Sequence, residues 1–121
     1  MSKVAFTLKV FGIYLLGLGL GLTLVPNLML SLFGIAPTSE VWIRVAGVLL
    51  FNIGIYYWYA AQYDARAFFM ASVFTRTLIL VAFATFALLR LVSPVLILFG
   101  LVDFLGGMWT LLALRAENKL R

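Results

Sequence analysis

Apolar residues along the chain are grouped into four long, nearly uninterrupted runs that are separated by short polar segments. Each run has about 20 residues, which is the length that a helix needs to cross the hydrocarbon core of a bilayer. None of them alternates between apolar and polar positions as the strands of a membrane β-barrel do. The pattern therefore predicts four membrane-crossing helices, at about residues 6–25, 41–61, 67–89 and 94–114.

The polar joins predict how these helices follow one another. Residues 62–66 and 90–93 are short connections, so consecutive helices must run antiparallel. We expect an all-α fold, an up-down-up-down bundle of four transmembrane helices that forms a single integral membrane domain over residues 1–121. Residues 28–34 are apolar but too short to cross, and they either continue the first helix beyond a kink at Pro26 or form a short interfacial helix.

Composition excludes an ordinary soluble domain. The sequence has 65% hydrophobic and 11% charged residues, whereas soluble domains have about 45–50% apolar and about 25% charged residues. Cysteine and histidine are both absent. Their absence excludes disulfides, metal sites built from Cys and His, and imidazole acid-base chemistry.

Basic residues predict the orientation of the chain. An even number of crossings places the N-terminus, the join at residues 62–66 and the C-terminus on one side. That side carries six of the nine basic residues, Lys3, Lys9, Arg66, Arg115, Lys119 and Arg121. The positive-inside rule therefore predicts that both termini are cytoplasmic. Attraction to anionic lipid headgroups accounts for the net charge of +5 without a nucleic acid partner.

Three polar residues are predicted to lie near the middle of the membrane. At about 1.5 Å per residue, Arg76 is roughly 15 Å and Asp103 roughly 18 Å from the cytoplasmic ends of their helices. Asn52 reaches nearly the same depth on the second helix. A charged side chain at this depth costs about 2.5–3.5 kcal/mol on insertion scales unless it finds a partner. We therefore expect Arg76 and Asp103 to form an inward-facing pair.

This polar cluster has two interpretations. In the first, Arg76 and Asp103 neutralise each other, Asn52 completes the hydrogen bonding, and the network fixes helix packing. In the second, the cluster binds a polar headgroup, an ion or a proton. Arg44 lies about one turn inside the outer end of its helix, where it either extends to the interface or lines the mouth of a polar cavity.

Glycines indicate which helix faces pack closely. Gly17 and Gly21 form a G-x-x-x-G motif on the first helix. Gly100 and Gly107 share one face of the fourth helix with Asp103. Small residues let membrane helices approach each other, so both faces are predicted contact surfaces. The partner helix belongs to this chain, to a second copy or to a different protein.

No catalytic or metal site is expected. Asp103 is the only acid in the predicted membrane interior. Paired-carboxylate acid-base catalysis is therefore excluded, and no nucleophile is near a plausible base. The sequence predicts a protein that is not an enzyme.

A set of positions spread along the chain forms a recognisable pattern. A Gly-rich first helix is followed by Pro26-Asn27-x-x-Leu30-x-Leu32-Phe33-Gly34, Trp42-x-Arg44-x-x-Gly47, Arg76 and Leu98-Phe99-Gly100-x-x-Asp103-x-x-Gly106. This pattern resembles that of small four-helix bacterial membrane proteins in the DoxX-like neighbourhood. For some members the resemblance implies a membrane subunit of a quinone-linked oxidoreductase. Without Cys and His, a redox role here would depend on a bound cofactor or a partner.

Two classes of function stay open. The first is a non-catalytic membrane subunit or binding module that packs on a membrane-protein partner, forms a homo-oligomer, or holds a lipid, quinone or pigment near Asn52, Arg76 and Asp103. The second is a small proton- or ion-coupled transporter or channel that uses the Asp103/Arg76 pair.

Overall fold

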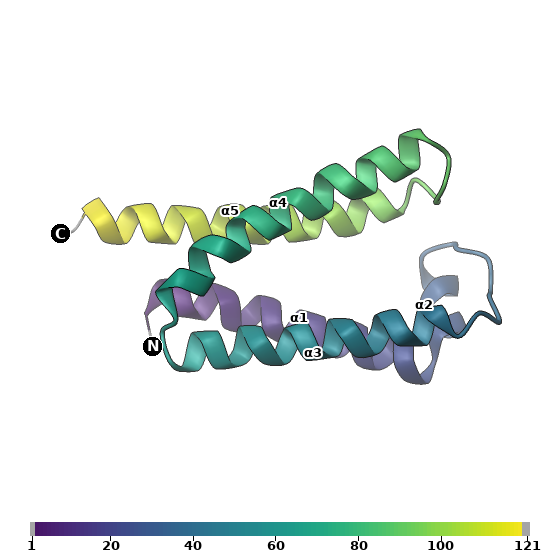
Figure 1. Ribbon diagram of the computed structural model, residues 1–121, viewed down its shortest axis with the longest axis horizontal. Helices are drawn as coiled ribbons and strands as arrows, with labels where there is room; N and C mark the ends of the chain where they lie inside the picture. The colour runs from purple at the N-terminus through teal and green to yellow at the C-terminus, as the bar shows by residue number, and fades with distance from the viewer. Residues whose placement is uncertain (1, 120–121) are drawn as a thin grey trace. The chain divides into compact units, whose positions relative to one another are not determined.

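The computed structural model describes residues 2–119, and all regular structure in that range is helical (Figure 1). The helices are α1 (Lys3–Leu24), α2 (Pro26–Leu32), α3 (Trp42–Gln62), α4 (Arg66–Leu88) and α5 (Leu96–Lys119). All except α2 are long and apolar enough to cross a membrane. The prediction of an all-α fold with four crossings is confirmed, and the chain is an integral membrane protein.

Helix α2 settles how the chain continues after the first crossing. Val25 has φ −135° and ψ 60°, which breaks the helical path before Pro26 begins α2. Proline suits this first position because its missing N–H would have had no helical acceptor. Helix α2 ends before Gly34, whose φ of +69° is a conformation that glycine adopts without strain. The segment is therefore a separate short helix and does not continue α1, and its position in the interface stays a prediction.

The chain divides into two compact units. The first, here the α1–α3 unit, consists of residues 9–59. The second, here the α4–α5 unit, consists of residues 1–8 and 60–121. The long helix α1 thus contributes its first residues to one unit and the remainder to the other.

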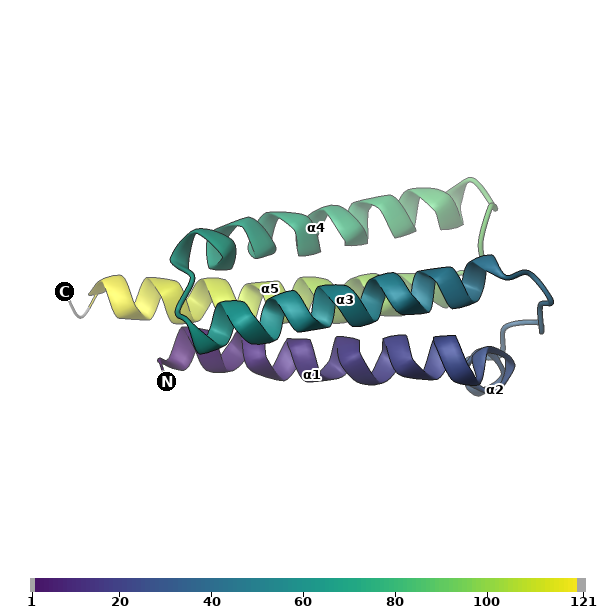
Figure 2. The same ribbon diagram turned by 60° about the horizontal axis from the view of Figure 1, so that its bottom comes forward.

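In the α1–α3 unit, α1 and α3 run antiparallel with their backbones in contact (Figure 2). Gly12 and Gly19 of α1 lie opposite Gly54 and Gly47 of α3. A Cβ added to Gly19 would lie 2.6 Å from the carbonyl oxygen of Gly47, and one added to Gly54 would lie 3.0 Å from that of Gly12. The glycines on each helix are seven positions apart, which keeps both on one face of a supercoiled pair.

In the α4–α5 unit, α4 and α5 also run antiparallel (Figure 1). Gly100 and Gly107 of α5 both lie against α4. A Cβ on Gly100 would be 3.0 Å from the Cα of Leu80, and one on Gly107 would be 3.5 Å from the Cβ of Arg76. These contacts fix the register of the two helices and place Arg76 opposite Gly107.

Polar side chains join three chain segments at one end of the α4–α5 unit. Arg66 donates hydrogen bonds to both carboxylate oxygens of Glu117, near the end of α5. Its Nε lies 3.1 Å from Oδ2 of Asp64, and the Ser2 hydroxyl donates to Oδ1 of the same carboxylate at 3.3 Å. The start of α1, the turn before α4 and the end of α5 are thereby connected.

Candidate functional site

Arg76 is the largest polar side chain in the interior of the α4–α5 unit, with 2% of its surface exposed. Its Nη2 donates hydrogen bonds to the hydroxyls of Ser72 and Thr110, both at 2.9 Å. Its Nε donates to the main-chain oxygen of Ser72 at 3.2 Å. Ser72 precedes Arg76 by one helical turn, so both side chains lie on the face of α4 that meets α5.

The hydrogen bonds of Arg76 continue through Thr110 to α1. The hydroxyls of Thr110 and Thr7 are 2.7 Å apart, and the Thr7 hydroxyl also lies 2.7 Å from the Val4 carbonyl oxygen. The Thr110 hydroxyl also lies 3.2 Å from the carbonyl oxygen of Gly106, so its single proton is directed either to Gly106 or to Thr7. These contacts connect Arg76 to Thr110, and Thr110 to Thr7 on α1. They tie α4, α5 and α1 together.

Asp103 is half-buried on α5 and interacts with Arg76 electrostatically. The hydrogen bonds described above join Arg76 to Ser72 and Thr110. The inward-facing pair of Arg76 with Asp103 stays a prediction. Long helical side chains lean toward the N-terminus of their helix, and for Arg76 that direction leads toward Thr110 and away from Asp103.

The other polar residues predicted for the site lie in the α1–α3 unit. Asn52 is exposed on α3, and its grouping with Arg76 and Asp103 stays a prediction. Arg44 donates a hydrogen bond to the carbonyl oxygen of Thr23, in the last turn of α1. A cation is stabilised at the C-terminal end of a helix by the carbonyl groups there. Arg44 therefore links α3 to the end of α1.

The close contact between α1 and α3 uses other glycines than Gly17 and Gly21. A Cβ on Gly17 would have open space within 4 Å, and one on Gly21 would meet the side chain of Met29 on α2. The close approach to α3 instead uses Gly12 and Gly19. The sequence favours the four-residue motif, whereas an antiparallel pair in contact over several turns repeats every seven residues.

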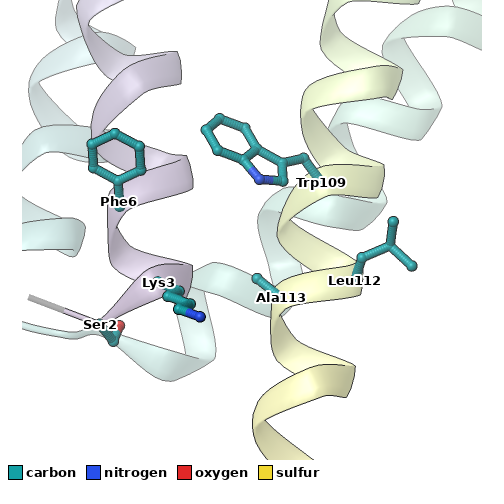
Figure 3. Close-up of a pocket in the computed structure, with 6 residues that line it drawn as sticks. All are labelled: Ser2, Lys3, Phe6, Trp109, Leu112 and Ala113. Atoms are coloured by element: carbon teal, nitrogen blue, oxygen red, sulfur yellow. The ribbon is translucent and has the colours of Figure 1, made fainter.

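A groove between the start of α1 and α5 combines apolar walls with a charged side chain. Its volume is about 600 Å³. Phe6 and Trp109 extend toward each other across it (Figure 3), with ring centroids 6.0 Å apart and an interplanar angle of 87°. The residues that line it are Ser2, Lys3, Phe6, Trp109, Leu112 and Ala113.

From the sequence, Lys3 is expected only as one of the basic residues that set the orientation, and no site is expected at Phe6 and Trp109. The signal that could have identified them is topological. Four antiparallel crossings place the start of the first helix and the end of the last helix at the same face of the membrane. Lys3, Phe6 and Trp109 are therefore expected at similar depth, but their facing each other depends on helix rotation, which the sequence does not show.

The chemical groups present limit what these sites can do. Among residues 2–119, no three acidic, His or Cys side chains are close enough to hold a metal ion. The hydroxyls of Ser72, Thr110 and Thr7 all bond to main-chain oxygens or to one another. Comparison of the chain with models of protein families, with curated proteins and with solved structures finds no match.

Proposed function

We propose that this protein is a non-catalytic integral membrane module that holds a lipid-like ligand in the groove between α1 and α5. The observation that carries the proposal is the groove itself, in which an apolar wall of Phe6, Trp109 and Leu112 leads to Lys3 and Ser2 at one end. Its volume of about 600 Å³ lies within the range of about 300–1,000 Å³ that ligand sites occupy.

The order of side chains along the groove matches an amphipathic molecule. Lys3 precedes Phe6 by about one helical turn, which is roughly 4.5 Å along α1. Trp109 precedes Ala113 by about one turn, roughly 6 Å, on α5, which runs in the opposite direction. A polar headgroup would therefore meet Lys3, and an apolar chain would extend past the Phe6 and Trp109 rings.

The orientation of the chain in the membrane and its role beside a partner are part of the same proposal. Basic residues favour cytoplasmic termini in a bacterial inner membrane, which puts Lys3 at the level of the inner headgroups. The DoxX-like resemblance supports an accessory membrane subunit, in which the bound molecule is a lipid or a quinone presented to a partner. Lack of Cys and His supports the absence of an enzymatic role in this chain.

The alternative is a small proton- or ion-coupled transporter that uses Asp103 and Arg76. One observation favours it, namely that Asp103 is half-buried on α5 and interacts electrostatically with Arg76. The hydrogen bonds that hold Arg76 to Ser72 and Thr110 weigh against it, because they give Arg76 a structural role. Flux into liposomes that depends on pH and is lost in Asp103→Asn would support this alternative.

Native mass spectrometry after gentle extraction tests the proposed function. The wild-type protein should retain one lipid-like molecule per chain. Trp109→Ala should lower retention about ten-fold, because the lost indole contact is worth about 1.4 kcal/mol. Trp42→Ala is the matched control, since Trp42 lies on α3 outside the groove, and it should retain the molecule as the wild type does. Equal retention by the two variants would contradict the proposal.

A further inference from the structure

We infer that the groove selects a phospholipid whose headgroup carries a net negative charge, an inference that rests on the proposed function. The groove has one charged side chain in its lining, Lys3, at the end where the headgroup would lie. The remaining lining is apolar except for Ser2. Selectivity among lipids would therefore depend on the charge of the headgroup.

The positive charge of Lys3 is not neutralised by the acids at this end of the unit. Asp64 and Glu117 are the carboxylates there, and Arg66 contacts both of them. The Ser2 hydroxyl also bonds to Asp64. In the part of the chain that the structure describes, no carboxylate pairs with Lys3. A negatively charged ligand is the partner that complements it.

The position of Lys3 suits a headgroup phosphate. Figure 3 shows its side chain at the mouth of the space between α1 and α5, one turn from the Phe6 ring. A lysine stem can lie along an apolar surface while its ammonium group reaches the headgroup region. The phosphate would then meet the ammonium, and the first acyl carbons would lie against Phe6 and Trp109.

Headgroup charge separates this ligand from the other amphipathic candidates. A zwitterionic phospholipid brings its own cation, and a quinone ring is neutral, so neither gains a net attraction from Lys3. An anionic phospholipid gains about 1 kcal/mol per basic side chain near the membrane surface. One lysine therefore predicts a preference of about five-fold.

Fluorescence quenching of Trp109 measures this preference directly. Trp42→Phe and Trp58→Phe together leave Trp109 as the only tryptophan. This double variant is reconstituted in phosphatidylcholine vesicles that contain a small fraction of a brominated lipid. The brominated lipid is either phosphatidylglycerol or phosphatidylcholine, with the bromine on the acyl chains. Brominated phosphatidylglycerol should quench Trp109 with about five-fold higher apparent affinity. Lys3→Gln should abolish the difference, and Lys3→Arg should keep it.

Arg90→Gln is the matched control for charge. It removes one positive charge at the opposite end of the α4–α5 unit, beyond the end of α4, and should leave the preference unchanged. A preference that falls equally in Lys3→Gln and Arg90→Gln would reflect net charge and would overturn the inference. Orientation of both variants is checked by protease access to a C-terminal tag, and Lys3→Arg serves if Lys3→Gln inserts incorrectly.

The outcome also separates this inference from the proposed function. Equal quenching by the two lipids, combined with a lipid retained in native mass spectrometry, would overturn the charge selectivity and leave the groove as a lipid site. Equal quenching with no retained lipid would overturn both. A five-fold preference that depends on Lys3 supports both.

Discussion

Gly19→Ala should destabilise the protein by about 3 kcal/mol, while Gly17→Ala should leave its stability nearly unchanged. A Cβ at position 19 would lie 2.5 Å from the backbone nitrogen of Phe51 and 2.6 Å from the carbonyl oxygen of Gly47. Both are backbone atoms, so α1 and α3 must separate, and overpacking of this kind costs about 1–3 kcal/mol. A methyl group added at Gly17 would meet only open space.

Reversible unfolding in mixed detergent micelles, followed by circular dichroism, gives the two free energies. Both variants add one methyl group to the same helix, so differences in helix propensity and hydrophobicity cancel in the comparison. Equal free energies of unfolding would contradict the backbone contact between α1 and α3. A larger loss in Gly17→Ala would assign the contact to the Gly17 face instead.

Arg76→Ala should cost about 3 kcal/mol of unfolding free energy. Truncation opens a cavity between α4 and α5 and leaves Asp103 half-buried without its electrostatic partner. Thr110→Val removes the link between Arg76 and Thr7 with little change in volume, and should cost about 1 kcal/mol, since interhelical hydrogen bonds in membranes contribute about 0.6–1.7 kcal/mol.

The matched control for Arg76 is Arg44→Ala. Arg44 is exposed and makes one hydrogen bond, to the Thr23 carbonyl oxygen, so its truncation should cost under about 1 kcal/mol. The same unfolding measurement applies to all of these variants. If Arg76→Ala and Arg44→Ala lose the same unfolding free energy, the buried hydrogen-bonded network does not hold the unit together.

The crossings could be predicted from the sequence because they depend on local composition. Residues 6–25 and 67–89 are apolar on all sides, and no other environment accommodates such helices. The predicted ends of the helices were less exact. Helix α5 continues to Lys119 because Arg115, Glu117 and Asn118 extend the helix beyond the apolar run, where hydropathy gives no signal.

The candidate site was predicted in part, because depth follows from sequence position while direction does not. Counting residues placed Arg76 and Asp103 at similar depth. The structure shows that the guanidinium leans one turn toward the N-terminus of α4 and bonds to Thr110. A depth counted at the Cα level misses this displacement, which is comparable to the length of the arginine side chain.

The groove at Lys3 and the contact of Gly19 with Gly47 depend on helix rotation. In a helix that is apolar all round, periodicity does not distinguish the face that meets a neighbour from the face that meets lipid. The G-x-x-x-G spacing of Gly17 and Gly21 does not show which helix their face meets, and that contact stays a prediction. The contact with α3 uses Gly12 and Gly19.

Photo-cross-linking with a lipid that carries a reactive group in its acyl chain tests the central claim most directly. The labelled residues are mapped by mass spectrometry at low lipid-to-protein ratio. We expect labels concentrated on Phe6, Trp109 and Leu112, in the groove. Leu98 and Leu105 on α5 are also apolar and exposed but lie outside the groove, and they are the reference for contact with bulk lipid. Labels distributed evenly over both sets would show that the groove meets only bulk lipid and would contradict the proposed function.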